Sequence, residues 1–124
     1  VDKKLEIVLN SNFDVIYCFD SFEQIPFDLI KKNLNANSKL TLAYEPTWAI
    51  GTGETATVEH IEDIHLKVTY ALESFNVNDI PILYGGSVNP ANSNLILHAK
   101  NVDGVLVGGA STKIEQFTGI INSI

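Results

Sequence analysis

The stretch LTLAYEPTWAIGTGETA, residues 40–56, decides how the rest of the chain is interpreted. It begins as an apolar run that predicts a strand over residues 40–45 and ends that strand on Glu45. A glycine-containing loop follows, residues 46–56. An acidic side chain at the end of an apolar strand, followed by such a loop, is typical of the functional end of a parallel α/β sheet.

Helix and strand signals alternate on both sides of this stretch. The predicted order is helix 2–10, strand 13–18, a segment 22–34 that is helical from Phe27, strand 40–45, helix 58–75, strand 81–84, a helix that starts at Asn89-Pro90 and runs through Ala99, strand 103–107 and helix 113–123. This alternation predicts an α/β fold with parallel strands covered by helices. An open doubly wound sheet and a section of a closed barrel both satisfy it. No linker divides the chain, so residues 1–124 are expected to form one unit.

The composition excludes several classes of protein. The chain has 124 residues, 8 Lys, no Arg and a formal net charge of −7, which argues against nucleic-acid binding. No apolar stretch approaches the roughly 20 residues of a membrane-spanning helix. The single cysteine, Cys18, cannot form an intrachain disulfide, so we expect a cytoplasmic protein.

The residues that could carry chemistry follow the predicted strands. Glu45 ends one strand, Tyr84-Gly85-Gly86-Ser87 ends the next, and Gly108-Gly109-Ala110-Ser111 ends the last. Glycine pairs before helix N-termini favour phosphate binding, although each pair could instead make a tight turn. A partly buried Glu45 could act as a base, or it could be solvated or paired with a lysine.

The loop of residues 46–56 holds Trp48 and Ile50 beside Gly51-Thr52-Gly53. Apolar residues next to a glycine-rich tip favour a lid that closes over a ligand, and a packed static loop is the alternative. The histidines at 60, 65 and 98 have no acidic or cysteine partner at metal-ligand spacing, so no metal site is expected. Cys18 is predicted to be a small core residue.

Three segments resemble those of the triosephosphate isomerase family: AYEPTWAIGTGETA (43–56), YGGSV (84–88) and VDGVLVGGAS (102–111). Their order and spacing are also similar. The resemblance covers nearly the whole chain, but it corresponds to the C-terminal half of a (β/α)8 TIM barrel, which has eight strands and about 250 residues. It implies that the N-terminal half of the barrel lies outside this chain.

The resemblance also implies roles for individual residues. Glu45 would be the general base that moves a proton between two carbons of dihydroxyacetone phosphate or glyceraldehyde 3-phosphate, without a metal or organic cofactor. Tyr84 and Ser87 would hold the closed lid. The substrate phosphate would be bound by backbone N–H groups of Gly51, Ser87, Gly108 and Gly109. The lid would comprise two hinges, Pro46-Thr47-Trp48 and Glu54-Thr55-Ala56, and between them Ala49, Ile50, Gly51, Thr52 and Gly53.

The sequence departs from the family pattern at several positions. Thr47 stands where Val is usual, and Glu54 where Lys is usual. Cys18 is followed by Phe19-Asp20-Ser21 instead of Ile-Gly-Glu, so Trp48 loses its usual glutamate partner. Thr69 replaces an arginine, which leaves Asp103 without its expected ion pair.

The family's lysine and histidine electrophiles belong to the half that this chain lacks. We therefore expect the chain to pair with that N-terminal half, with another copy of itself, or to aggregate, and the complete enzyme to be a dimer. A non-catalytic phosphate-binding half-barrel remains an alternative, and a different barrel enzyme with the same phosphate loops is a further one.

Overall fold

The strands and helices alternate along the chain as the sequence predicts. The computed structural model describes all 124 residues. In chain order the elements are α1 (Asp2–Leu9), β1 (Asp14–Phe19), α2 (Phe27–Asn33), β2 (Lys39–Tyr44), α3 (Val58–Ser74), β3 (Ile82–Tyr84), α4 (Ser93–Leu97), β4 (Gly104–Val105) and α5 (Ile114–Ile121), with short 3-10 turns at Phe22–Gln24, Thr47–Ala49 and Gly109–Thr112.

The four strands form one parallel sheet in the order β1-β2-β3-β4. A doubly wound sheet would reverse its strand order at a switch point, and this sheet does not. The fold is therefore a section of a barrel. Tyr44 is in register with Phe19 on one side and with Tyr84 on the other, so the carboxyl ends of the strands are level.

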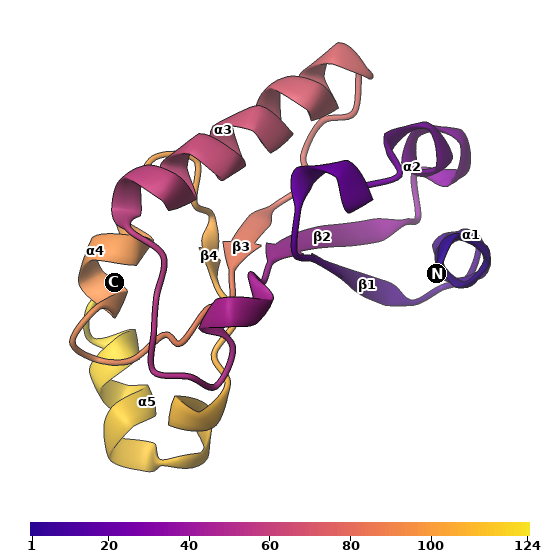
Figure 1. The fold of residues 1–124 in the computed structure, drawn as a ribbon. Helices are drawn as coiled ribbons and strands as arrows, with labels where there is room; N and C mark the ends of the chain where they lie inside the picture. The colour runs from indigo at the N-terminus through magenta and orange to yellow at the C-terminus, as the bar shows by residue number, and fades with distance from the viewer.

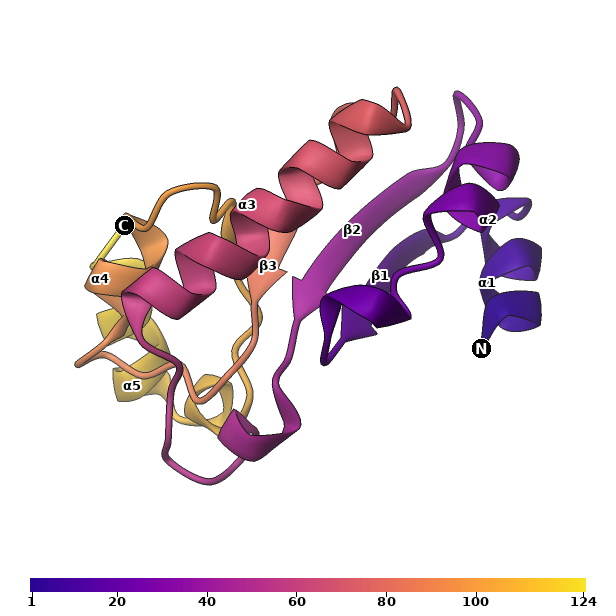
Figure 2. The same ribbon diagram turned by 45° about the horizontal axis from the view of Figure 1, so that its top comes forward.

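The helices lie around one side of the curved row of strands (Figure 1). Side chains that alternate along β2, including Leu42 and Tyr44, pack in a core with Ile61 and Val68 of α3. Figure 2 shows α3 running along this side of the sheet. Its first turn is capped by Thr57, whose hydroxyl oxygen accepts a hydrogen bond from the backbone N–H of His60 at 3.2 Å.

The other side of the sheet carries no helix, and here one prediction is wrong. Cys18, expected in the core, is exposed. Because successive side chains of a strand alternate between faces, Val15, Tyr17 and Phe19 take the helix-facing side of β1 and leave Ile16 and Cys18 on the open side.

Helix α4 begins three residues later than predicted, at Ser93 instead of Pro90. The side-chain oxygen of Asn89 accepts hydrogen bonds from the backbone N–H groups of Ala91 (2.8 Å) and Asn92 (3.1 Å). These are bonds of the N-cap type, which satisfy backbone N–H groups that the first turn of a helix leaves without partners. Residues 90–92 form a turn, and the regular helix begins after it.

The ends of the chain lie far apart, with the N-terminus beside α1 and the C-terminus near α4 (Figure 1). Strands β1 and β4 stand at the two ends of the strand order, so each leaves one edge unpaired. None of the helices is long and apolar enough to cross a membrane.

Thr69 and Asp103 each form a hydrogen bond with the backbone. Asp103 forms no ion pair, and its carboxylate instead accepts a hydrogen bond from the backbone N–H of Ile82 at 2.8 Å. The Thr69 hydroxyl donates to the carbonyl of His65 within its own helix at 2.9 Å.

Candidate active site

Glu45 follows the last residue of β2 and is half-buried at the level carboxyl ends of the strands. Its backbone N–H donates to the carbonyl of Phe19 at 2.8 Å, which ties it to the end of β1. Its side chain lies over Gly85, where an added Cβ would sit 2.6 Å from the Glu45 Cγ and 2.9 Å from its Oε1. Gly85 is thus required by the room that the Glu45 carboxylate takes.

Cys18 on β1 is a neighbour of this carboxylate. Partial burial raises the pKa of the Cys18 thiol to about 11, and the nearby charge of Glu45 and a hydrogen bond to that carboxylate act in the same direction. The thiol therefore stays protonated near neutral pH.

The near end of the loop 46–56 is a 3-10 turn, Thr47–Ala49, that follows the buried Pro46. Thr47 donates two hydrogen bonds to the carboxylate of Asp20, from its backbone N–H to Oδ1 at 2.9 Å and from its hydroxyl to Oδ2 at 3.1 Å. Trp48 is 49% exposed, and its ring centre lies 6.5 Å from that of His60.

The far end of the loop is held by Tyr84. Its hydroxyl oxygen accepts from the backbone N–H of Ala56 at 3.0 Å and lies 3.0 Å from the Thr55 hydroxyl. The Ser87 hydroxyl donates to the carbonyl of Ala49. Tyr84 and Ser87 therefore contact the two ends of one loop. Between these contacts the loop is exposed from Ile50 to Thr55.

The two glycine pairs differ in their surroundings. A Cβ on Gly86 would collide with the Tyr84 hydroxyl and with Ala49, so packing within the protein explains the first pair. A Cβ on Gly108 or Gly109 would meet nothing within 4 Å. No neighbouring group of the chain requires these two glycines, and their open backbone leaves room for a ligand to approach closely.

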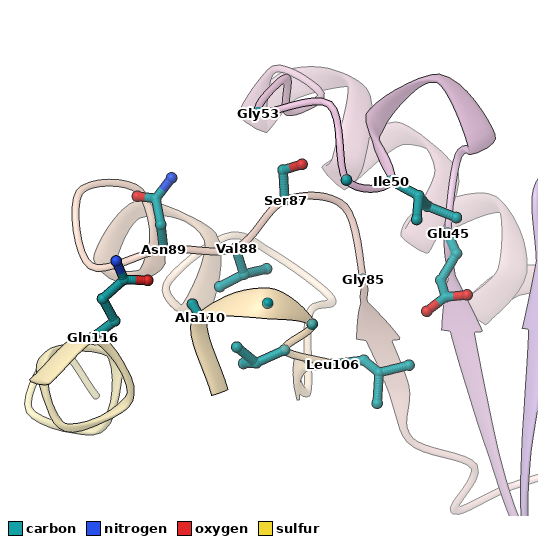
Figure 3. Close-up of a pocket in the computed structure, with 14 residues that line it drawn as sticks. Glu45, Ile50, Gly53, Gly85, Ser87, Val88, Asn89, Leu106, Ala110 and Gln116 are labelled. Carbon is teal, nitrogen blue, oxygen red and sulfur yellow. The ribbon is translucent and has the colours of Figure 1, made fainter. Parts of the chain in front are cut away.

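A cavity of about 340 Å³ joins these groups (Figure 3). Figure 3 shows Glu45 on one side of it, with Asn89 and Gln116 on the other. Its size is at the small end of ligand sites. Five of the residues singled out from the sequence for catalysis or phosphate binding line it: Glu45, Gly51, Ser87, Gly108 and Gly109.

The whole chain, residues 1–124, matches the model of the family described as triosephosphate isomerase. The chain belongs to the triosephosphate isomerase family. Among curated relatives, the triosephosphate isomerase of Helicobacter hepaticus is 40% identical over 99% of this chain and 54% of its own length. That of Borreliella burgdorferi is 43% identical over 82% of this chain and 44% of its own. That of Jannaschia sp. is 49% identical over 70% of this chain and 36% of its own length.

The chain thus spans about half the length of the triosephosphate isomerases it matches. Around this cavity the structure brings together Glu45, the loop residues Ile50, Gly51 and Gly53, and three glycines of the two pairs, Gly85, Gly108 and Gly109.

Contacts of Asp20 and Cys18 were not predicted. Asp20 directly follows β1, and the other residues singled out for chemistry also lie at or after strand ends. This position was a signal in the sequence that Asp20 belongs to the same region. Asn89 and Gln116 carry no such signal in the sequence.

Proposed function

We propose that residues 1–124 form one unit, the C-terminal half of a triosephosphate isomerase that interconverts dihydroxyacetone phosphate and glyceraldehyde 3-phosphate. One observation carries this proposal. A half-buried carboxylate and an open glycine backbone line the same cavity, and a loop tied at both ends borders it.

In this proposal the phosphate lies against the N–H groups of Gly51, Ser87, Gly108 and Gly109. The bound phosphate then fixes the carbon skeleton relative to Glu45, and such positioning lowers the barrier by making the proton transfer intramolecular. Glu45 removes a proton from one substrate carbon and returns it to the neighbouring carbon. The lid, residues 46–56, covers the reacting atoms and excludes water.

The same mechanism needs groups that this chain does not supply. Proton removal leaves negative charge on the substrate oxygens, and groups that stabilise such charge are often the largest source of catalysis. The family resemblance assigns them to a lysine and a histidine of the N-terminal half. We therefore propose that half as the chain's partner, a dimer as the complete enzyme and the cytoplasm as its location.

The test joins this chain to the part of the Helicobacter hepaticus relative that precedes the matched region. We expect the fusion to isomerise the triose phosphates and the chain alone to be inactive. Glu45→Gln in the fusion should lower the rate by about 10²- to 10⁴-fold, the usual contribution of a general base. A fusion that folds but shows the same rate with Gln at position 45 would refute the proposal.

A non-catalytic phosphate-binding half-barrel is the second candidate, because the open backbone at Gly108 and Gly109 does not depend on Glu45. In that case the chain binds glycerol 3-phosphate, Gly108→Ala weakens binding, Glu45→Gln does not, and the folded fusion shows no turnover.

A further inference from the structure

Asp20 connects the end of β1 to the first residues of the loop 46–56. Its two carboxylate oxygens accept separate hydrogen bonds from Thr47, one from the backbone N–H at 2.9 Å and one from the hydroxyl at 3.1 Å. A hydrogen bond to an ionised acceptor is stronger than one between neutral groups. This pair of bonds is therefore a specific attachment of the loop.

Asp20 is itself held in place. Its backbone N–H donates to the side-chain oxygen of Gln24 at 2.8 Å, and the carbonyl of Gln24 accepts from the Tyr17 hydroxyl at 2.9 Å. Tyr17 belongs to β1, which is paired with β2 along its whole length. These bonds hold the backbone of Asp20, and with it the base of its side chain, close to β1.

The end of β1 forms hydrogen bonds with the segment after β2 at two residues, one on each side of Pro46. The carbonyl of Phe19 accepts from the backbone N–H of Glu45 at 2.8 Å, and one residue later Asp20 holds Thr47. Glu45 is therefore held by one of these bonds and lies two residues before the other, while the loop from Ile50 to Thr55 is exposed.

We propose that Asp20 is a positioning residue that fixes the near hinge of the lid, so that Glu45 keeps its place while the lid tip moves. The catalytic part of this inference rests on the proposed isomerase function. The attachment itself does not, and it can be measured in the chain without substrate.

The first experiment follows hydrogen exchange of individual backbone amides in the full chain by NMR. Asp20→Ala should speed exchange of the Thr47 amide about tenfold, because an exposed bond to a charged acceptor is lost. The Ala56 amide, held by Tyr84, should exchange as before. Asp28→Ala, which removes an equal charge from α2, should change neither amide. An unchanged Thr47 amide in Asp20→Ala would overturn the proposal.

Trp48 gives an independent signal, because it is the only tryptophan of the chain and follows Thr47 directly. Its fluorescence anisotropy should fall in Asp20→Ala and stay unchanged in Asp28→Ala. Asp20→Asn keeps an oxygen for the Thr47 amide and an amide group for the Thr47 hydroxyl. It should therefore restore most of the anisotropy, which a general loss of folding would not allow.

The second experiment measures turnover in the fusion described above. Asp20→Ala should lower kcat about tenfold with little change in KM, since Gly108 and Gly109 lie on a different strand end, and Asp20→Asn should recover most of kcat. An unchanged kcat despite faster Thr47 exchange would overturn the positioning role. If the native fusion is inactive, the isomerase proposal fails, and the exchange result alone decides whether Asp20 fixes the loop.

Discussion

At the scale of single residues, the Glu45 carboxylate is surrounded by groups that limit where it can lie. Gly85 leaves space beneath it, and the Cys18 thiol lies near it on the neighbouring strand. The thiol adds no charge beside Glu45, because its raised pKa keeps it protonated near neutral pH. The position of this carboxylate is therefore limited by its neighbours on β1 and β3.

This arrangement predicts that Cys18 reacts slowly although it is exposed. A pKa raised from 9.0 to about 11 lowers the thiolate fraction at pH 8 about a hundredfold. Because a thiolate of higher pKa is more nucleophilic, the net effect is about tenfold slower alkylation than for an ordinary cysteine. The rate of iodoacetamide labelling of the folded chain, compared with the chain in urea, measures this.

Glu45→Gln supplies the control, since burial is the main cause of the raised Cys18 pKa and the charge of Glu45, which this change removes, raises the pKa further. Its folded form should be labelled faster than the native chain at every pH below 11. Equal labelling rates in the two folded chains would show that the thiol and the carboxylate do not interact.

The candidate site was predictable for those residues whose position depends only on the local sequence pattern. Glu45 and the glycine pairs lie at strand ends, and strand ends can be predicted from apolar runs. The side of the strand on which Cys18 lies was not predictable, because it depends on which alternate residues the helices cover. The Asp20–Thr47 bonds join residues 27 positions apart and need the register of β1 and β2.

At the scale of elements, α3 is attached to the loop before β4 through His65. This side chain is fully buried, and one ring nitrogen, Nδ1, lies 2.9 Å from the carbonyl oxygen of Asn101. A carbonyl can only accept, so Nδ1 carries the proton. The other nitrogen, Nε2, is buried without a partner. Protonating it would place an unsatisfied charged donor in the core.

Stability should therefore fall in acid. Burial lowers the pKa of His65 below 6.5, while the Asn101 carbonyl and the charge of Asp103 oppose this. Below pH 6.5 the unfolded chain binds a proton that the folded chain does not, so the free energy of unfolding falls by up to about 1.4 kcal/mol per pH unit until the lower folded pKa is reached. Urea unfolding at pH 7.5 and 5.5 measures the loss.

His65→Asn is the matched variant, because its Nδ2 can still donate to the Asn101 carbonyl but does not titrate. It should be less stable at pH 7.5, since it leaves a small cavity, yet lose less stability between the two pH values. An identical loss in both chains would assign the acid sensitivity to other groups.

The elements themselves were largely predictable, since each helix or strand was found from periodicity and flanking residues. The start of α4 was placed three residues too early, because Asn89-Pro90 is an N-cap signal and Asn89 caps a turn at residues 90–92 that precedes the regular helix. Periodicity also left the barrel section and the doubly wound sheet open. Only the strand order decides between them, and it is set by pairing between distant segments.

At the scale of the whole molecule, apolar side chains are exposed where a barrel would continue. Ile16 on the helix-free side of β1 is 53% exposed. On α5, the exposed residues Ile114, Phe117 and Ile121 follow helical spacing and share one face. Ile16 belongs to β1, an edge strand of the sheet, and exposed apolar surface together with a free strand edge favours association.

If the N-terminal half covers the open side of the sheet, Ile16→Asp should block its binding without unfolding this chain. Ile16 contributes little to the core of the chain alone, but in a closed barrel the new carboxylate would be buried without a partner. The lost apolar burial and the buried charge together should weaken association at least tenfold.

Leu95→Asp is the control, since Leu95 is 65% exposed on α4. Sedimentation of each chain mixed with the N-terminal part of the Helicobacter hepaticus relative measures binding, and circular dichroism checks that each is folded. If Ile16→Asp binds as well as Leu95→Asp, the partner does not cover this side of the sheet, and the half-barrel then has no route to a closed site through that partner.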